Sequence, residues 1–235
     1  MLVARDIAHK VLGRSEVDPM AMSINTNVGA MLALQNLNKT NRGLEQTQLR
    51  VTTGLRINGP KDDAATFAIA QNMRGDIAGM TAVKTNLSLG QSVVNVAIDA
   101  GKAIEDLLIE MKAKSVQASQ AGLDTDSYTA LNQEFTSLRA QIEAIVASAE
   151  FNGKNLINSA ATNFDVLSTV DGSTITITKQ AIDATTLTIH TAALTDATVA
   201  GTALTAISQA IISVSNALAS LGSSAKRVDI QTEFT

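Results

Sequence analysis

The stretch Gly54–Ala65 reads Gly-Leu-Arg-Ile-Asn-Gly-Pro-Lys-Asp-Asp-Ala-Ala and decides how the chain folds. Proline lacks a backbone donor and pushes the residue before it out of the helical region, so Gly59-Pro60 is a strong break. Directly after it, Asp62 and Asp63 are placed to cap a new helix and to interact favourably with its positive N-terminal dipole. Helical patterning precedes the break and resumes after it. The stretch therefore predicts a stiff joint between two long helices.

The pattern before the joint is helical from Asn27 to Leu55. Its leucines and valines recur three and four positions apart, and the polar residues Asn41 and Gln48 occupy the same seam. A seam with polar insertions is typical of a coiled coil, where polar positions set the register at some cost in stability. A single amphipathic helix is marginal in water, so this segment, residues 22–60 with the joint, needs a partner.

Beyond the joint, helical patterns predict helices at residues 64–119, 127–149 and 203–235. In the last two, apolar residues alternate three and four positions apart, which predicts left-handed coiled-coil packing. Glycines inside the first of these helices each weaken it by about 1 kcal/mol relative to alanine, yet no proline or turn cluster interrupts it. Its apolar stripe includes Ile69, Met73, Ile77, Met80, Val83, Leu87, Leu108, Met111 and Val116.

The composition changes over residues 160–200, which are rich in threonine and alternate locally between apolar and polar residues. Thr174–Thr178 and Leu187–Ile189 have the two-residue period of strands, and Asp171-Gly172 is a turn before the first of them. These features predict a small β-hairpin unit. The predicted fold is therefore mainly α, a long antiparallel coiled-coil rod over residues 61–235 that carries this hairpin.

Composition excludes several classes of function. The 235 residues include no cysteine, so disulfides, thiolate metal sites and thiol catalysis are excluded. The net charge of -4 argues against a nucleic-acid surface, and no continuous apolar run reaches the roughly 18 residues of a membrane span. His9 and His190 have no neighbours at metal-ligand spacing, and no nucleophile–base pair or phosphate loop is visible. We predict no enzyme activity, catalytic residue, cofactor or metal, and no nucleic-acid or membrane partner.

Residues 1–21 differ in character from the rest of the chain. They are mixed in charge and precede a second plausible start at Met20 or Met22. We interpret them as a disordered leader or tag rather than a native arm. They lack the charged and then apolar pattern of a secretory signal.

Four motifs together resemble bacterial flagellin. They are SINTNVGAMLALQNLNKTN near the start, TGLRINGPKDDAATFAIA at the joint, EFNGKNLI after residue 149, and KRVDIQTEFT at the end. The resemblance implies a secreted structural subunit that self-assembles into the flagellar filament for motility after export through the flagellar type III apparatus. The implied partners are other flagellin subunits, an export chaperone, and cap and junction proteins. The implied assembly interface comprises Leu34, Leu37, Leu44, Val51, Leu55, Arg56 and Ile57.

The chain departs from the family pattern in three respects. The large outer domains of many flagellins are absent, and the C-terminal helix that partners the first helix in the family is expected to be missing after Thr235. An alternative interpretation is a flagellin-like surface protein that binds a polysaccharide or a host ligand. The third departure lies in the stretch that innate immune receptors detect.

That stretch resembles LQRVRELAVQ in detected flagellins and reads LIEMKAKSVQ in this chain. Glu110 stands where the pattern has arginine, and Lys114 stands where it has leucine. One change reverses a charge and the other places a charge in an apolar contact. We therefore expect the receptor to be at most a weak partner, through a degenerate patch of Leu108, Glu110, Lys114 and Gln117.

Overall fold

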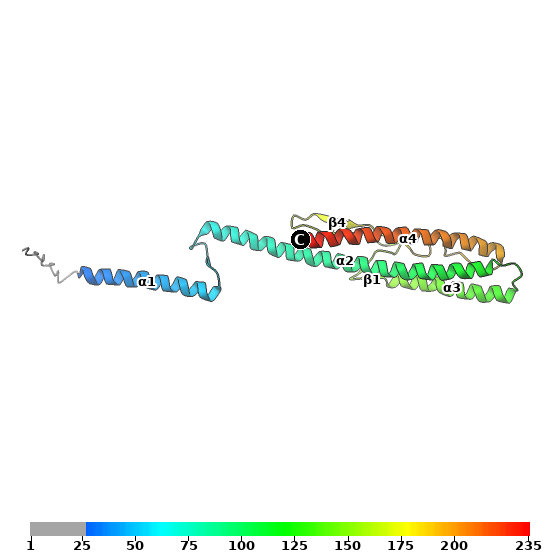
Figure 1. The fold of residues 1–235 in the computed structure, drawn as a ribbon, viewed down its shortest axis with the longest axis horizontal. Helices are drawn as coiled ribbons and strands as arrows, with labels where there is room; N and C mark the ends of the chain where they lie inside the picture. The colour runs from blue at the N-terminus through cyan, green and yellow to red at the C-terminus, as the bar shows by residue number, and fades with distance from the viewer. Residues whose placement is uncertain (1–26) are drawn as a thin grey trace, which may run out of the picture. The chain divides into compact units, whose positions relative to one another are not determined.

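A computed structural model describes residues 27–235, and the expected leader over residues 1–21 lies outside the described residues. The helices are α1 (Val28–Thr53), α2 (Ala64–Ala118), α3 (Thr125–Ser148) and α4 (Ala197–Phe234). Two small antiparallel sheets pair β1 (Glu150–Phe151) with β2 (Lys154–Asn155) and β3 (Phe164–Leu167) with β4 (Thr174–Ile177) (Figure 1). The mainly helical fold predicted from the sequence is confirmed.

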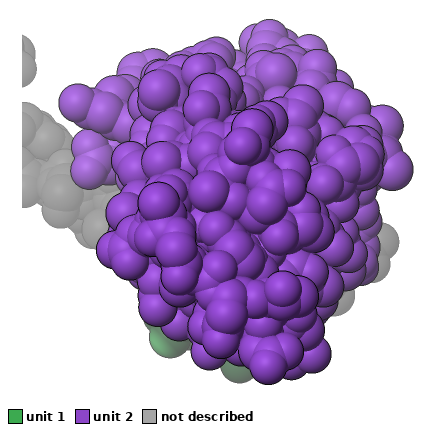
Figure 2. Space-filling view, turned by 90° about the vertical axis from the view of Figure 1, so that its right-hand side faces the viewer, with its two compact units in different colours: residues 1–71 green, residues 72–235 purple. Residues whose placement is uncertain are grey.

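The chain divides into two compact units after Gln71, inside α2 rather than at Pro60. The second unit, residues 72–235, presents a continuous surface in the view of Figure 2. Its core comes from α2, α3 and α4 together with the loop and hairpin between α3 and α4. The largest fully buried side chain is Phe135 of α3, and the rest of the core is aliphatic.

Helices α3 and α4 bury stripes close to those that their periodicity predicts, with small shifts. In α3 the buried residues are Leu131, Phe135, Ile142 and Val146, while Ile145 lies at the edge of the core. A straight helix repeats every 3.6 residues, so its buried stripe drifts from a strict heptad pattern. In α4, alanines take alternate buried positions: the stripe is Ala200, Ala203, Ile207, Ala210, Val214, Ala217, Leu221, Ala225 and Val228.

Helices α2 and α4 run antiparallel in a defined register. The Ser215 hydroxyl donates to the Glu105 carboxylate at 2.7 Å, and the Leu218 side chain packs against Gly101. In the alternative orientation of the Gln91 amide, which gives up the hydrogen bond to Asn95, the nitrogen lies 3.3 Å from the Asp229 carboxylate, in the same register.

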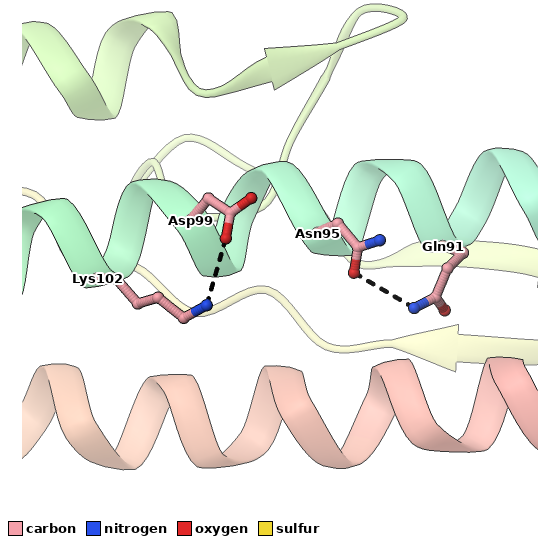
Figure 3. Close-up of polar contacts among 4 residues, drawn as sticks. All are labelled: Gln91, Asn95, Asp99 and Lys102. Atoms are coloured by element: carbon pink, nitrogen blue, oxygen red, sulfur yellow. Dashed lines mark hydrogen bonds and ion pairs between the residues drawn. The ribbon is translucent and has the colours of Figure 1, made fainter.

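The outer face of α2 beside this contact is polar. It carries the Lys102–Asp99 pair at 3.4 Å and a Gln91–Asn95 hydrogen bond (Figure 3). Exposed pairs of this kind contribute little to stability. The register therefore depends on packing more than on charge.

Three of the glycines that weaken α2 lie where other elements pack closely against its backbone. A Cβ at Gly79 would lie 2.8 Å from Val170, one at Gly90 would lie 2.6 Å from Val166, and one at Gly101 would lie 2.7 Å from Leu218. The three positions are eleven residues apart, which is about three helical turns, so they share one face. The hairpin and α4 pack directly against the α2 backbone along this face.

One predicted strand is wrong. The partner of β4 is β3, in the register Phe164↔Ile177, and residues 184–188 instead form turns. Thr188 has a positive φ of 58°, and the Asp183 carboxylate accepts hydrogen bonds from the Thr186 backbone and hydroxyl. Leu187 and Ile189 are buried. The alternation of apolar and polar residues around Thr188 therefore comes from a turn that places the side chains of Leu187 and Ile189 in the core.

Polar side chains of α3 hold this loop in place. One guanidinium nitrogen of Arg139 donates to the carbonyls of His190 and Ala192, at 2.8 and 3.0 Å. The Asn132 side chain accepts from the Leu194 backbone at 2.9 Å. These bonds satisfy loop carbonyls and an amide that have no sheet partner, which lets an irregular segment cover the core.

One helix of the described chain, α4, is long and apolar enough to cross a membrane by length and composition alone. Its most apolar 18-residue window has a mean hydropathy of 1.5, and 28% of that window is buried. The window includes polar residues, so it is not the continuous apolar run that the sequence was found to lack. The buried stripe of α4 packs in the bundle core, as expected for a core helix rich in alanine.

We predict opposite effects for alanine at two glycines of α2. Gly90→Ala should destabilise the chain, because overpacking against buried Val166 costs about 1–3 kcal/mol and the helix-propensity gain is at most about 1 kcal/mol. Gly75→Ala meets nothing within 4 Å and should stabilise α2 by about 0.5–1 kcal/mol. Urea unfolding of both variants measures this. A Gly90→Ala variant as stable as Gly75→Ala would contradict close packing of the hairpin on α2.

Candidate assembly surface

Helix α1 has well-formed ends and no buried residue. The Asn27 side chain accepts from the Ala30 backbone at 3.1 Å and caps the first turn. Gly54 ends the helix with a φ of 68°, the left-handed conformation that glycine adopts without strain. Both ends of α1 thus have local cap geometry, while none of its residues is buried.

The predicted interface residues of α1 are exposed in the chain. Leu34, Leu37, Leu44 and Val51 are 55% to 79% exposed. After the helix, Leu55 and Ile57 are partly buried, and Arg56 is exposed. Lone apolar residues on a surface are ordinary, whereas a row of four along one helix face is a candidate interaction surface.

The joint is held by two aspartates with different roles. Asp63 accepts from the backbone nitrogens of Ala65 and Thr66, both at 3.1 Å, and so caps α2. Asp62, expected to share this cap, instead accepts from the Asn58 backbone at 3.1 Å and from the Gln46 side chain at 3.2 Å. It therefore connects α1 to the turn that precedes Pro60.

The Asp63 carboxylate is stabilised in its charged form. The Thr66 hydroxyl, which donates to it at 2.6 Å, and the Thr66 backbone lower the pKa of Asp63 below its ordinary value. The positive charge of Arg56 adds a smaller effect in the same direction. A carboxylate with a lowered pKa strengthens the cap at neutral pH and weakens it only in acid.

The beginning of α2 adds an exposed surface that the sequence pattern assigned to the core. Ile69, Met73, Ile77 and Met80 are 47% to 63% exposed, and burial on α2 starts at Val83. Antiparallel helices advance equally per residue, so the α2–α4 register places the end of α4 level with roughly residue 86 of α2. The first turns of α2 therefore extend past the last turn of α4. Only this register separates the exposed part of the stripe from the buried part.

The structure changes the composition of the degenerate receptor patch. Leu108 is fully buried, so it belongs to the core and cannot contact a partner. Val116, expected to pack, is 48% exposed. Glu110 and Gln117 are exposed, and Lys114 forms an ion pair with Glu134 of α3. A groove of 630 Å³ between α2 and α3 is lined by Leu107, Glu110, Lys114, Gln133, Glu134, Ser137, Leu138 and Gln141.

Acidic side chains raise the pKa of Lys114. The hydrogen bond and the charge of Glu134 are the largest causes, with a further contribution from Glu110. Lys114 therefore stays charged over the physiological range. Within residues 27–235, no group of three or more histidine, aspartate or glutamate side chains is arranged to hold a metal ion.

The candidate site within residues 27–235 is a set of exposed helix faces on a mainly helical protein. A family profile described as the bacterial flagellin N-terminal helical region matches residues 24–162. The chain is 46% identical over 160 residues to flagellin FljK of Caulobacter vibrioides, and 44% identical over 160 residues to flagellin FljM of the same organism.

Both alignments cover 68% of this chain, and the chain spans 59% of the length of these two relatives. The crystal structure of Bacillus cereus flagellin has a similar fold, with a TM-score of 0.60 at 22% identity over 65% of this chain and 89% of that one. The chain belongs to the bacterial flagellin family. The resemblance seen in the four motifs is confirmed.

We predict that the pKa of Asp63 depends on the Thr66 hydroxyl. In the folded chain it should lie below its ordinary value, so the cap is complete above that value and is lost as the pH falls through the folded pKa. Thr66→Val should raise the pKa of Asp63, because the strongest bond to the carboxylate is removed. Titration of the Asp63 carboxyl carbon by NMR measures this. Thr81→Val, whose hydroxyl donates to the Ile77 carbonyl, is the control, and equal pKa values in both variants would contradict the assignment.

Proposed function

We propose that this chain is a structural subunit of the bacterial flagellar filament, which joins other flagellin subunits through the apolar face of α1. The observation that carries the proposal is the row Leu34, Leu37, Leu44 and Val51, exposed on a helix without a buried residue. Membership of the flagellin family supports a filament as the assembly. The joint residues Gly59, Pro60, Asp62 and Asp63 lie between α1 and α2 in the chain.

The gain from covering this face is large enough to drive association. Full burial of a leucine or valine side chain is worth roughly 1.5–3 kcal/mol, so four contribute on the order of 6–12 kcal/mol before the cost of association. Asn41 and Gln48 lie within the same seam. Polar residues at such positions select one register over others, as a regular assembly requires.

The same proposal gives the chain a location and further partners. A filament subunit acts outside the cell, at the cell surface, and reaches the filament through the flagellar export apparatus. An export chaperone and the cap and junction proteins are its proposed additional partners. We propose no catalytic role, and nothing in residues 27–235 favours the alternative of a surface protein that binds a polysaccharide or a host ligand.

A charge on the apolar face of α1 should block incorporation into filaments. Leu37→Asp would bury a carboxylate in the subunit contact, and its cost of at least about 1.4 kcal/mol corresponds to a tenfold or greater loss of incorporation. Gln35→Asp is the matched control, because two residues turn a helix by roughly 200° and place it on the opposite face. It should keep incorporation within about twofold of the unmodified chain.

The assay adds fluorescently labelled chain to sheared fragments of flagellin filaments and measures the fluorescence that sediments with them. Circular dichroism shows whether both variants remain equally helical. The proposal fails if the unmodified chain does not enter the polymer. It also fails if Leu37→Asp enters as well as Gln35→Asp.

We further propose that the chain is a weak agonist of the innate flagellin receptor because of Glu110 and Lys114. The double variant E110R/K114L should raise receptor signalling at least about tenfold, since it restores one charge and one apolar contact. Glu134 would lose its ion-pair partner but is 56% exposed, so the fold should tolerate the change. The variant D106R/K102L, with the same charge changes outside the stretch, is the control. A strong response to the unmodified chain would contradict the assignment.

A further inference from the structure

The turn between β1 and β2 is formed by Asn152 and Gly153, one of the two Asn-Gly pairs in the sequence. Phe151 pairs with Lys154 across it, so the turn has two central residues. Both have a positive φ, 50° for Asn152 and 74° for Gly153. Tight hairpin turns of this kind favour Asn-Gly, because asparagine tolerates the left-handed region and glycine adopts it without strain.

The amide side chain in this turn is exposed and makes no contact that fixes it. Asn152 and Gly153 are both exposed, and within residues 27–235 neither the Asn152 side chain nor the Gly153 nitrogen makes a hydrogen bond. The next asparagine is held on both sides. Its Oδ1 accepts from the Ile157 backbone at 2.9 Å, and the Nδ2 of this residue, Asn155, donates to the Val146 carbonyl at 2.7 Å.

We propose that Asn152 is a site of spontaneous deamidation. The Gly153 backbone nitrogen attacks Cγ of Asn152, a C–N bond forms, and the side-chain nitrogen leaves as ammonia with the proton that the Gly153 nitrogen gives up. Water then adds to one carbonyl of the cyclic imide and breaks one of its two C–N bonds. The products are aspartate and isoaspartate. The net reaction consumes water and releases ammonia, and it needs no oxidant or reductant.

The residues that form the turn also favour the reaction. Glycine has no Cβ, so no side chain crowds the attacking nitrogen. The turn must open for Cγ of Asn152 to reach that nitrogen. A hairpin is marginal even with longer strands, and β1 and β2 have two residues each. Opening this turn is therefore easy.

The other Asn-Gly pair is held more firmly. The Asn58 nitrogen donates to the Asp62 carboxylate at 3.1 Å, and the Gly59 carbonyl accepts from the Asp62 nitrogen at 3.1 Å. Asn58 and Gly59 are also partly buried. Moving this backbone into the geometry for attack breaks both bonds, so the fold directs the reaction to Asn152.

Deamidation changes both the charge and the length of the turn. Either product adds a negative charge near Glu150, whose carboxylate lies 4.0 Å from the place where a Cβ of Gly153 would be. Isoaspartate also adds one atom to the main chain. A two-residue turn sets the register of its hairpin, so the reacted chain loses the pairing of Phe151 with Lys154. The inference does not depend on the proposed function.

The first test incubates the folded full chain at mildly alkaline pH and measures deamidation by peptide mass spectrometry. Asn152 should react at least about tenfold faster than Asn155, whose amide is bonded and whose neighbour Leu156 has a side chain. It should also react several-fold faster than Asn58. In urea the rates at Asn152 and Asn58 should become equal, because the dipeptide is the same. Equal rates in the folded chain, or a difference that persists in urea, would overturn the inference.

The second test quantifies isoaspartate by enzymatic methylation of its free carboxylate. Asn152→Gln should lose most of the signal, because the longer side chain would have to close a larger and less favoured ring. Asn58→Gln is the matched control and should keep most of the signal. Circular dichroism checks that both variants are equally helical. A signal in Asn152→Gln equal to that of the unmodified chain would assign the reaction to another asparagine and overturn the inference.

Discussion

Direct contact between side chains and the α2 backbone is the interaction on which the second unit depends. The core holds one large buried aromatic residue, Phe135, so its helices cannot be kept apart by bulky rings. They approach through alanine on α4 and through Gly79, Gly90 and Gly101 on α2. Each glycine lowers the intrinsic helix stability, but together they seat the hairpin and α4. A glycine that lowers the stability of an isolated helix thus stabilises the bundle, because it allows close packing.

The same contacts determine which apolar residues reach solvent. Leu218 against Gly101 and Ser215 against Glu105 define how far α4 extends along α2. The hairpin extends coverage as far as Gly79 through Val170. The side chains of Met73 and Ile77, on earlier turns of the helix, are left exposed.

The sequence predicts the helices well because their signals are local. The break at Pro60, the cap at Asp63 and the periodicity of α3 depend on residues within a few positions of one another. The strand predicted at Leu187–Ile189 fails because a two-residue period is equally produced by a turn that buries alternate side chains. Deciding between the two requires Arg139 and Asn132, which lie on α3, far from the loop in sequence. Met73 and Val116 are predicted to be buried but are exposed for a related reason, because burial depends on which neighbour lies opposite.

The apolar stripes of this chain differ in one respect that explains their different fates. The buried stripe of α4 is apolar at all nine positions, so nothing in it opposes permanent burial. The stripe of α1 places Asn41 and Gln48 among its leucines, and each amide must find a partner or remain in water. A stripe of that kind is less stable when buried and more selective about what covers it. A fold core needs a stripe in which nothing opposes burial. A surface that stays open until the correct neighbour arrives needs a stripe that is selective about what covers it. The position of the polar residues within a seam, rather than the periodicity of the seam, therefore distinguishes the exposed stripe of α1 from the buried stripe of α4.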